Sequence, residues 1–308
     1  MMQKITGVIP AMVTPFDKEG NIDGQAIRQI VGFLKDQQVD GLYLTGSTGE
    51  GFLMSPEERK QVIEITAEAA DGTLPFIVHA GAIGTKVTID LARHAEACGA
   101  AAVSSVPPFY WKFGPENIEK YYREIAESVE VPVIMYNIAL AGVMDLSTIR
   151  RMAEIPNVRG IKYTAPTQFE MLELREQLGP DFVIYSGSDE MAMSGLGYGA
   201  DGIIGTFYNI LPDLYLDLYR ASLRKDLDAM LDKQKIANQV ILTCLRHEMI
   251  PTVKAMMRWI GIDAGYARSP FRQFTREEEL ALMEEFRPIR ELPGAEKVLF
   301  LSKEWTLT

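Results

Sequence analysis

One lysine of this 308-residue chain lies in an unusual setting. Lys162 falls inside the apolar run at residues 158–163, whereas most other lysines lie in charged stretches that are typical of exposed helices. An ammonium group is costly to bury, and an uncharged amine can attack a carbonyl carbon. Lys162 is therefore either a nucleophile that forms an imine with a carbonyl substrate, or a strand-end lysine that is paired with a carboxylate.

The segment at residues 46–50, Gly-Ser-Thr-Gly-Glu, also follows an apolar run. It lacks the Gly-Lys-Ser/Thr ending of a P-loop, which argues against a nucleotide site. Its backbone N–H groups and the hydroxyls of Ser47 and Thr48 suit a small anion such as a carboxylate. The alternative is a flexible turn without a ligand.

Phenolic and acidic groups follow two more strand-like runs. Tyr136 is either an acid–base group or a core aromatic residue whose hydroxyl bonds to the backbone. Asp189 and Glu190 precede an expected helix, where carboxylates interact favourably with the helix dipole. These two residues are therefore either substrate ligands or helix-start residues.

The histidines and cysteines do not have the spacing of metal ligands. His79, His94 and His247 lie far apart in the sequence, so we expect no metal cofactor. His79, at the end of an apolar run, either lines a pocket or is a core residue. The two cysteines, Cys98 and Cys244, are also far apart and cannot build a disulfide framework.

The net charge of the chain excludes some classes of partner. With 31 Lys and Arg against 42 Asp and Glu, the formal charge at pH 7 is −11. Nucleic acids and anionic membranes attract basic surfaces, so we expect neither as a partner. No stretch of about 18 uninterrupted apolar residues indicates a membrane span, and Gly7, Pro10 and Pro15 interrupt the apolar pattern of a signal peptide. We expect a cytoplasmic protein.

The reactive residues must be positioned by a repeated βα pattern. Apolar runs recur about every 20 to 35 residues, and each is followed by a turn and an amphipathic stretch, which is the length of one βα unit. Eight such units predict an α/β fold, a (β/α)8 TIM barrel, whose reactive groups lie at the carboxyl ends of the strands. The expected strands are residues 7–13, 41–44, 76–78, 101–103, 133–136, 160–162, 182–185 and 202–204.

The remainder of the chain reads as helices. We predict a barrel over residues 1–222 and a C-terminal helical extension over 223–308 that forms one structural unit with it. The expected helices are residues 214–231, 233–246 and 252–260. The pattern of the apolar run at residues 292–301 does not indicate its role.

Five segments together resemble one enzyme family. They are residues 46–50, Pro108-Phe-Tyr110, Tyr136-Asn137, Gly160-Ile-Lys162 and Ala200-Asp-Gly202. In this order and at barrel spacing, they resemble the class I aldolases typified by N-acetylneuraminate lyase and dihydrodipicolinate synthase. The resemblance extends from residue 7 to about residue 271. It implies a Schiff base between Lys162 and a 2-oxo acid, no other cofactor, and a homotetramer.

The details favour the lyase branch of this family. The synthase branch is expected to carry an arginine shortly after the Tyr136 position, but residues 138–143 are uncharged. Residues 186–190 resemble the sugar-binding loop of the lyases, in which a glycine carbonyl and two carboxylates accept hydroxyl groups. Three departures put the identity of the sugar acid in doubt: no proline follows Ile138, Ser188 stands in place of an aromatic residue, and Thr206 replaces a serine.

The resemblance implies cleavage of N-acetylneuraminate to pyruvate and N-acetylmannosamine. Lys162, Tyr136, Ser47 and Tyr110 are the implied catalytic residues, with Tyr110 reaching a neighbouring subunit. The alternatives are another 2-oxo-3-deoxy sugar acid aldolase or dehydratase, dihydrodipicolinate synthase, or a non-catalytic sensor of 2-oxo acids. The implied substrate-binding residues are Ser47, Thr48, Thr164, Gly187, Asp189, Glu190 and Thr206.

Overall fold

The computed structural model describes residues 4–307. Eight parallel strands form one sheet in the order β1-β8-β7-β6-β5-β4-β3-β2. A bridge between Ala11 and Tyr43 joins the first two strands, so the sheet closes into a barrel, and the predicted (β/α)8 fold is confirmed. The strands are β1 (Gly7–Pro10), β2 (Leu42–Leu44), β3 (Phe76–His79), β4 (Ala102–Ser105), β5 (Val133–Ile138), β6 (Val158–Thr164), β7 (Val183–Ser186) and β8 (Gly202–Gly205).

Alternate residues of each strand face opposite sides of the sheet, and both sides are apolar. In β5, Ile134 and Tyr136 belong to the cluster inside the barrel, whereas Val133 and Met135 pack in the layer between strands and helices. A parallel sheet that is covered on both faces produces this pattern. Lys162 pairs in register with Tyr136 and lies on the same inner side.

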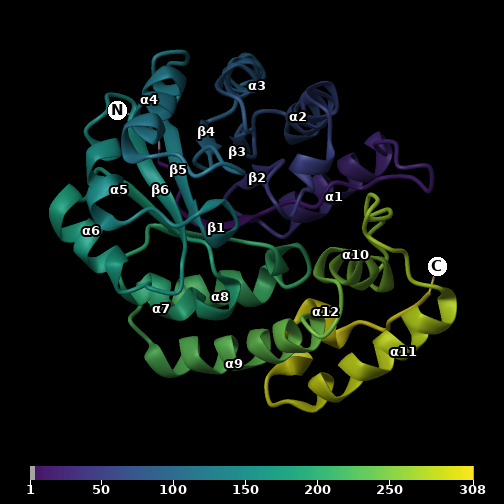
Figure 1. Ribbon diagram of the computed structural model, residues 1–308. Helices are drawn as coiled ribbons and strands as arrows, with labels where there is room; N and C mark the ends of the chain where they lie inside the picture. Colours follow the sequence, from purple (N-terminus) through teal and green to yellow (C-terminus); the bar gives the residue numbers. More distant parts are fainter. Residues whose placement is uncertain (1–3, 308) are drawn as a thin grey trace.

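Helices surround the strands on the outside of the barrel (Figure 1). The start of α2 shows how local sequence fixes a helix end: Ser55 accepts from the Glu58 N–H, and the Glu58 carboxylate accepts from the Ser55 N–H. This capping box satisfies two backbone donors that a helix end leaves free. The barrel helices are α1 (Gly24–Asp36), α2 (Pro56–Ala70), α3 (Thr85–Ala97), α4 (Pro115–Ala126), α5 (Leu146–Ala153), α6 (Glu170–Leu178), α7 (Ala192–Gly197) and α8 (Pro212–Leu223).

Within the described residues, four α-helices follow the barrel, and one predicted helix is wrong. The helix expected over residues 214–231 is two helices, because Lys225 has a φ of 57° and Asp226 caps the next helix through the Ala229 N–H. Helix α9 then packs against α7 and α8, as Figure 1 shows. The four are α9 (Leu227–Cys244), α10 (Met249–Trp259), α11 (Arg276–Phe286) and α12 (Leu299–Ser302).

The apolar run near the C-terminus completes an aromatic cluster. Phe300 stacks on Trp305 with ring centroids 4.9 Å apart, and both rings pack against Trp259 of α10. The Trp305 indole N–H donates to the Phe300 carbonyl at 2.7 Å. The tail therefore anchors the C-terminal helices, whereas the division of the chain after residue 222 stays a prediction. In the part of the chain that the structure describes, no helix is long and apolar enough to cross a membrane.

Candidate active site

Lys162 lies inside the barrel at the carboxyl end of β6. Its side chain is buried, with 4% of its surface exposed, and Nζ donates to the Tyr136 hydroxyl at 3.1 Å. The two residues are neighbours because β5 and β6 pair in a register that places Tyr136 opposite Lys162. The arrangement puts an amine and a phenol within one hydrogen bond of each other, which is the distance that proton transfer requires.

The absence of a side chain at Gly187 allows the loop after β7 to approach Lys162 and Thr164 closely. A Cβ atom at Gly187 would lie 1.9 Å from Thr164 Oγ1 and 3.0 Å from Lys162 Cε, so no larger residue fits there without displacing them. The Gly187 N–H donates to the Tyr163 carbonyl at 2.8 Å, which ties the loop after β7 to β6. Thr164 Oγ1 is buried without a hydrogen-bond partner among the described residues, so its hydroxyl is free for a ligand.

The turn at residues 46–50 is held beside the barrel axis. Thr48 Oγ1 and Thr206 Oγ1 share a hydrogen bond of 2.7 Å, which joins the turn to the end of β8. Thr45 and Glu50, at its two ends, have φ values of 54° and 56°, a backbone conformation that is unfavourable for residues other than glycine. Such a conformation persists only where surrounding contacts fix it.

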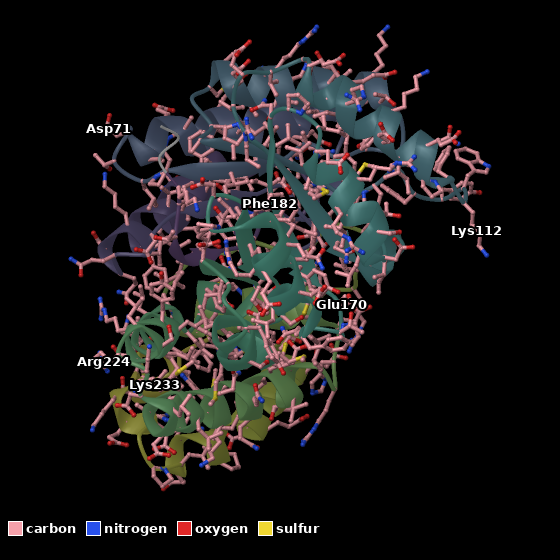
Figure 2. The ribbon with its side chains drawn as sticks, turned by 90° about the vertical axis from the view of Figure 1, so that its left-hand side faces the viewer. Asp71, Lys112, Glu170, Phe182, Arg224 and Lys233 are labelled. Atoms are coloured by element: carbon pink, nitrogen blue, oxygen red, sulfur yellow. The ribbon has the colours of Figure 1, made fainter. Side chains whose placement is uncertain are left out.

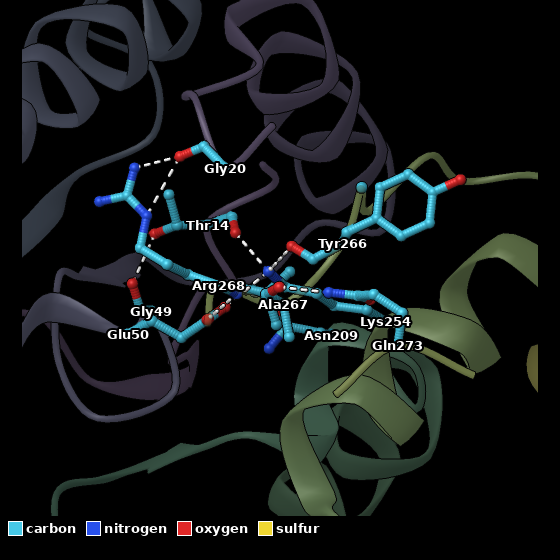
Figure 3. A network of polar contacts seen from close by, with 12 residues as sticks. Thr14, Gly20, Gly49, Glu50, Asn209, Lys254, Tyr266, Ala267, Arg268 and Gln273 are labelled. Atoms are coloured by element: carbon cyan, nitrogen blue, oxygen red, sulfur yellow. Dashed lines mark hydrogen bonds and ion pairs between the residues drawn. The ribbon is translucent and has the colours of Figure 1, made fainter. Parts of the chain in front are cut away.

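Those contacts come from α10 and from the loop that follows it. Lys254 of α10 donates from Nζ to Glu50 Oε1 at 2.5 Å, to the Thr14 carbonyl at 2.6 Å and to the Tyr266 carbonyl at 2.7 Å (Figure 3). The Arg268 N–H donates to Glu50 Oε2 at 2.7 Å. The side chains of Lys254 and Glu50 are both fully buried. The turn is therefore fixed by a buried ion pair from the other end of the chain.

Burial changes the titration of both partners of this pair. It lowers the pKa of Lys254 to about 8 and raises the pKa of Glu50, although the attraction between the charges opposes both shifts. An ammonium group has three donors, and here they meet three acceptors. This match holds Lys254 in its protonated form near neutral pH.

On the opposite side, Asp189 supports the loop after β8. Its carboxylate accepts from the Phe207 N–H at 2.9 Å and from the Thr206 N–H at 3.3 Å. Burial raises the pKa of Asp189 to about 7, while the Phe207 N–H lowers it and the nearby Glu190 carboxylate raises it further. Glu190 itself is exposed. The two acidic residues thus differ in setting. Asp189 is buried and bonded to the backbone, whereas the Glu190 side chain is exposed.

An apolar pocket of about 270 Å³ lies next to Ser47. Its wall comes from the turn after β2, the segments after β4 and β5, and residues 270–271. Ser47 is half-buried and Phe109 faces the same pocket. Its lining includes Ser47, Phe52, Phe109, Ile138, Leu140 and Phe271.

Tyr110 lies outside the site of its own chain. It is 81% exposed and has a φ of 82°, and its ring packs edge-on against Trp111, which is 62% exposed. Figure 2 shows the next residue, Lys112, at the edge of the molecule. The structure thus brings the other predicted site residues to the carboxyl end of the barrel, but Tyr110 does not join them within one chain.

His79, at the end of β3, lies inside the barrel near the rings of Tyr43 and Tyr136. His79 is buried, its Nε2 accepts from the Val106 N–H at 3.3 Å, and its ring meets Tyr136 edge-on. Burial and the Arg59 charge keep the pKa of His79 well below its ordinary value, so it is a neutral ring. Among residues 4–307, no three His, Cys, Asp or Glu side chains are grouped so that they could hold a metal ion.

Comparison with known proteins assigns the chain to a family. Residues 4–287 match the Dihydrodipicolinate synthetase family over nearly the whole chain. The chain belongs to this family. The family predicted from the sequence is confirmed.

Several relatives in the Dihydrodipicolinate synthetase family are lyases. N-acetylneuraminate lyase from Rhizobium meliloti (strain 1021) is 35% identical over 287 residues, which cover 93% of this chain and 96% of that protein. N-acetylneuraminate lyase 2 from Escherichia coli O6:H1 is 38% identical, over 88% of this chain and 90% of that protein. A structure from Clostridium difficile in complex with mannosamine superposes with a TM-score of 0.90 at 32% identity, covering 93% of this chain and 100% of that chain.

Proposed function

We propose that this protein is a class I aldolase that reversibly cleaves N-acetylneuraminate to pyruvate and N-acetylmannosamine. The observation that carries the proposal is the buried Lys162 amine within 3.1 Å of the Tyr136 hydroxyl. The relatives named above support the choice of substrate, because they are N-acetylneuraminate lyases of almost the same length. No metal or further cofactor takes part in the proposed reaction.

The reaction begins with covalent binding. The substrate carboxylate lies against the turn at residues 46–50, where Ser47 and Thr48 donate from their hydroxyls. The Lys162 amine attacks the C2 ketone, and loss of water from the resulting carbinolamine leaves an iminium between C2 and Nζ. The iminium carbon then serves as the acceptor of an electron pair.

Bond cleavage follows from this electron acceptor. Tyr136, acting through the substrate carboxylate, removes the proton of the C4 hydroxyl as a general base. The C3–C4 bond breaks, its electron pair moves to the iminium to give an enamine, and the C4 oxygen becomes the aldehyde. Protonation of the enamine at C3 and hydrolysis of the iminium release pyruvate and restore the lysine.

The polyhydroxylated end of the substrate extends toward β7 and β8. Thr164 has a free buried hydroxyl, and Glu190 has an exposed carboxylate that accepts hydroxyl donors. The Gly187 carbonyl, Asp189 and Thr206 complete this part of the site. Asp189 already accepts two backbone N–H groups, so its main contribution is to hold Thr206 in place.

The active assembly is a homotetramer in which Tyr110 reaches a neighbouring site and supports the hydroxyl relay with Ser47. The exposure of the Tyr110 ring and the apolar pocket beside Ser47 support this arrangement, because an exposed aromatic side chain and an apolar pocket are features that a subunit interface would bury. The location is the cytoplasm, and two free cysteines are compatible with it. Size-exclusion chromatography with light scattering measures the molar mass of the assembly, which should be four times the 34.4 kDa of one chain.

Trapping with borohydride tests the mechanism. Pyruvate and sodium borohydride should irreversibly alkylate one lysine, and mass spectrometry of the digested protein should place the adduct on Lys162. Lys162→Arg keeps the charge but cannot form the imine, so it is the matched control. An adduct at another lysine, or none, refutes the mechanism and favours a non-catalytic binder of 2-oxo acids.

A substrate panel tests the specificity. Pyruvate release from N-acetylneuraminate should exceed release from shorter 2-oxo-3-deoxy sugar acids. Synthase turnover with aspartate semialdehyde should be negligible, because residues 138–143 offer no cation for its carboxylate. Faster release from another sugar acid assigns the chain to a different aldolase of this family, and synthase turnover comparable to cleavage overturns the lyase proposal.

A further inference from the structure

Tyr43 is a large, fully buried aromatic residue that the mechanism above does not use. It lies on β2, across the barrel from Lys162, and only 1% of its surface is exposed. Its hydroxyl donates to Ser104 Oγ at 3.1 Å, and burial raises the pKa of this hydroxyl well above its ordinary value. The phenol is therefore committed to the barrel wall and is not available as an acid or base.

The Tyr43 ring contacts three parts of the site. Lys162 Nζ lies over its face, 4.7 Å from the ring centroid, and over the Tyr136 ring at 4.2 Å. The Tyr43 and Tyr136 rings meet edge to face with centroids 6.1 Å apart. A Cβ atom at Gly46 would lie 2.7 Å from Tyr43 Cε1, so the carboxylate-binding turn also rests on this ring.

We propose that the Tyr43 ring stabilises the iminium that forms on Lys162 in the proposed aldolase reaction. The face of an aromatic ring carries negative electrostatic potential, and its attraction for a cation is strongest where water is excluded. Two rings on one nitrogen provide that environment in this barrel. This inference rests on the proposed function and adds a residue that determines how much covalent intermediate accumulates.

The proposal predicts which step the ring affects. The iminium carries the positive charge, whereas the enamine that follows C3–C4 cleavage is neutral at nitrogen. A ring that stabilises the cation therefore favours imine formation and does not favour bond cleavage itself. Loss of the ring should lower kcat/KM and the amount of trapped imine more than it lowers kcat.

Two substitutions separate the ring from the hydroxyl. Tyr43→Phe keeps the ring and should retain imine trapping with pyruvate within about threefold of wild type. Tyr43→Leu removes the ring and should lower trapping by about tenfold or more, in line with a desolvated cation–π contact. Equal trapping in Tyr43→Leu and wild type, or an equal loss in Tyr43→Phe and Tyr43→Leu, overturns the proposal.

A graded series covers the case in which Tyr43→Leu does not fold. Phenylalanine, difluorophenylalanine and pentafluorophenylalanine at position 43 have nearly the same shape, but each step weakens the negative potential of the ring face. Trapped imine should fall along the series while the melting temperature stays level. Constant trapping along the series overturns the proposal, whereas absent trapping on Lys162 in the wild type refutes the aldolase function instead.

Discussion

Replacing Lys254 by methionine tests whether the C-terminal helices position the carboxylate-binding turn. Methionine is similar in length but removes the charge and the three donors that reach Glu50, Thr14 and Tyr266. Glu50 would then remain fully buried without its cation. Breaking a buried ion pair in this way typically destabilises a protein by about 3–5 kcal/mol.

A second variant measures the coupling between the two charges. Glu50→Gln removes the charge but keeps an oxygen that can accept from the Arg268 N–H. The double variant loses both charges and leaves neither one buried alone. Its loss of stability should therefore be smaller than the sum of the single losses by at least about 1 kcal/mol, as expected for residues in direct contact.

The assay combines unfolding with pyruvate binding. Urea unfolding at one protein concentration gives the stability of each variant, and borohydride trapping well below the melting temperature gives the pyruvate affinity. Lys254→Met should weaken pyruvate binding by about tenfold. Without the ion pair, the turn that presents Ser47 and Thr48 must be ordered when pyruvate binds, and we expect this to cost about 1.4 kcal/mol of binding free energy.

The matched control is Lys235→Met, since Lys235 forms an exposed pair with Asp232 at 3.4 Å. Removing that pair should change stability by less than about 1 kcal/mol and leave pyruvate affinity unchanged. Two results would refute the reasoning about Lys254: a stability loss no larger than that of the control, or single losses that simply add in the double variant.

Three further predictions concern the two acidic residues and the tail. Because the pKa of Asp189 is raised from 3.8 to about 7, its contribution to stability is present below pH 4 and is lost as pH rises through 7. Urea titrations should therefore show that wild type loses stability relative to Asp189→Asn between pH 5 and 8, by at most about 1.4 kcal/mol per pH unit. Glu190→Gln should lower the affinity for a long sugar acid by about tenfold in competition binding and leave the affinity for pyruvate unchanged. Trp305→Ala should lower the free energy of unfolding by about 3 kcal/mol, because it empties part of the aromatic cluster, without changing pyruvate affinity.

Sequence reasoning could locate Lys162 because its charge lies among apolar residues near the end of a strand whose other charged residue, Arg159, is exposed near the start. A similar signal is present in α10, where Lys254 lies between Val253 and Ala255 in a mostly apolar helix whose other charged residue is Arg258. The pattern in α10 does not predict the role of Lys254, because the partner, Glu50, lies 204 residues away and no local pattern connects the two. Long-range ion pairs of this kind become visible only when the fold places both side chains together.

Tyr43 shows a different limit. Both faces of a barrel strand are apolar, so the composition of residues 41–44 does not indicate which side chains face the interior. The register of the closed barrel decides it, through the bridge between Ala11 and Tyr43. The break between α8 and α9 was missed for a local reason: no glycine or proline marks it, and Asp226, a good N-cap residue, was the only signal.

Burial alone does not distinguish a reactive lysine from a structural one. Lys254 and Lys162 are both buried, but Lys254 has three oxygen acceptors for its three donors. Within residues 4–307, Lys162 donates only to the Tyr136 hydroxyl, and two aromatic rings occupy the space around Nζ. All three donors of Lys254 are paired and hold it in place, whereas Lys162 Nζ has one hydrogen-bond partner among the described residues and stays available for the proposed attack on a carbonyl. The number of acceptors around each Nζ thus supports a structural role for Lys254 and the proposed nucleophilic role for Lys162.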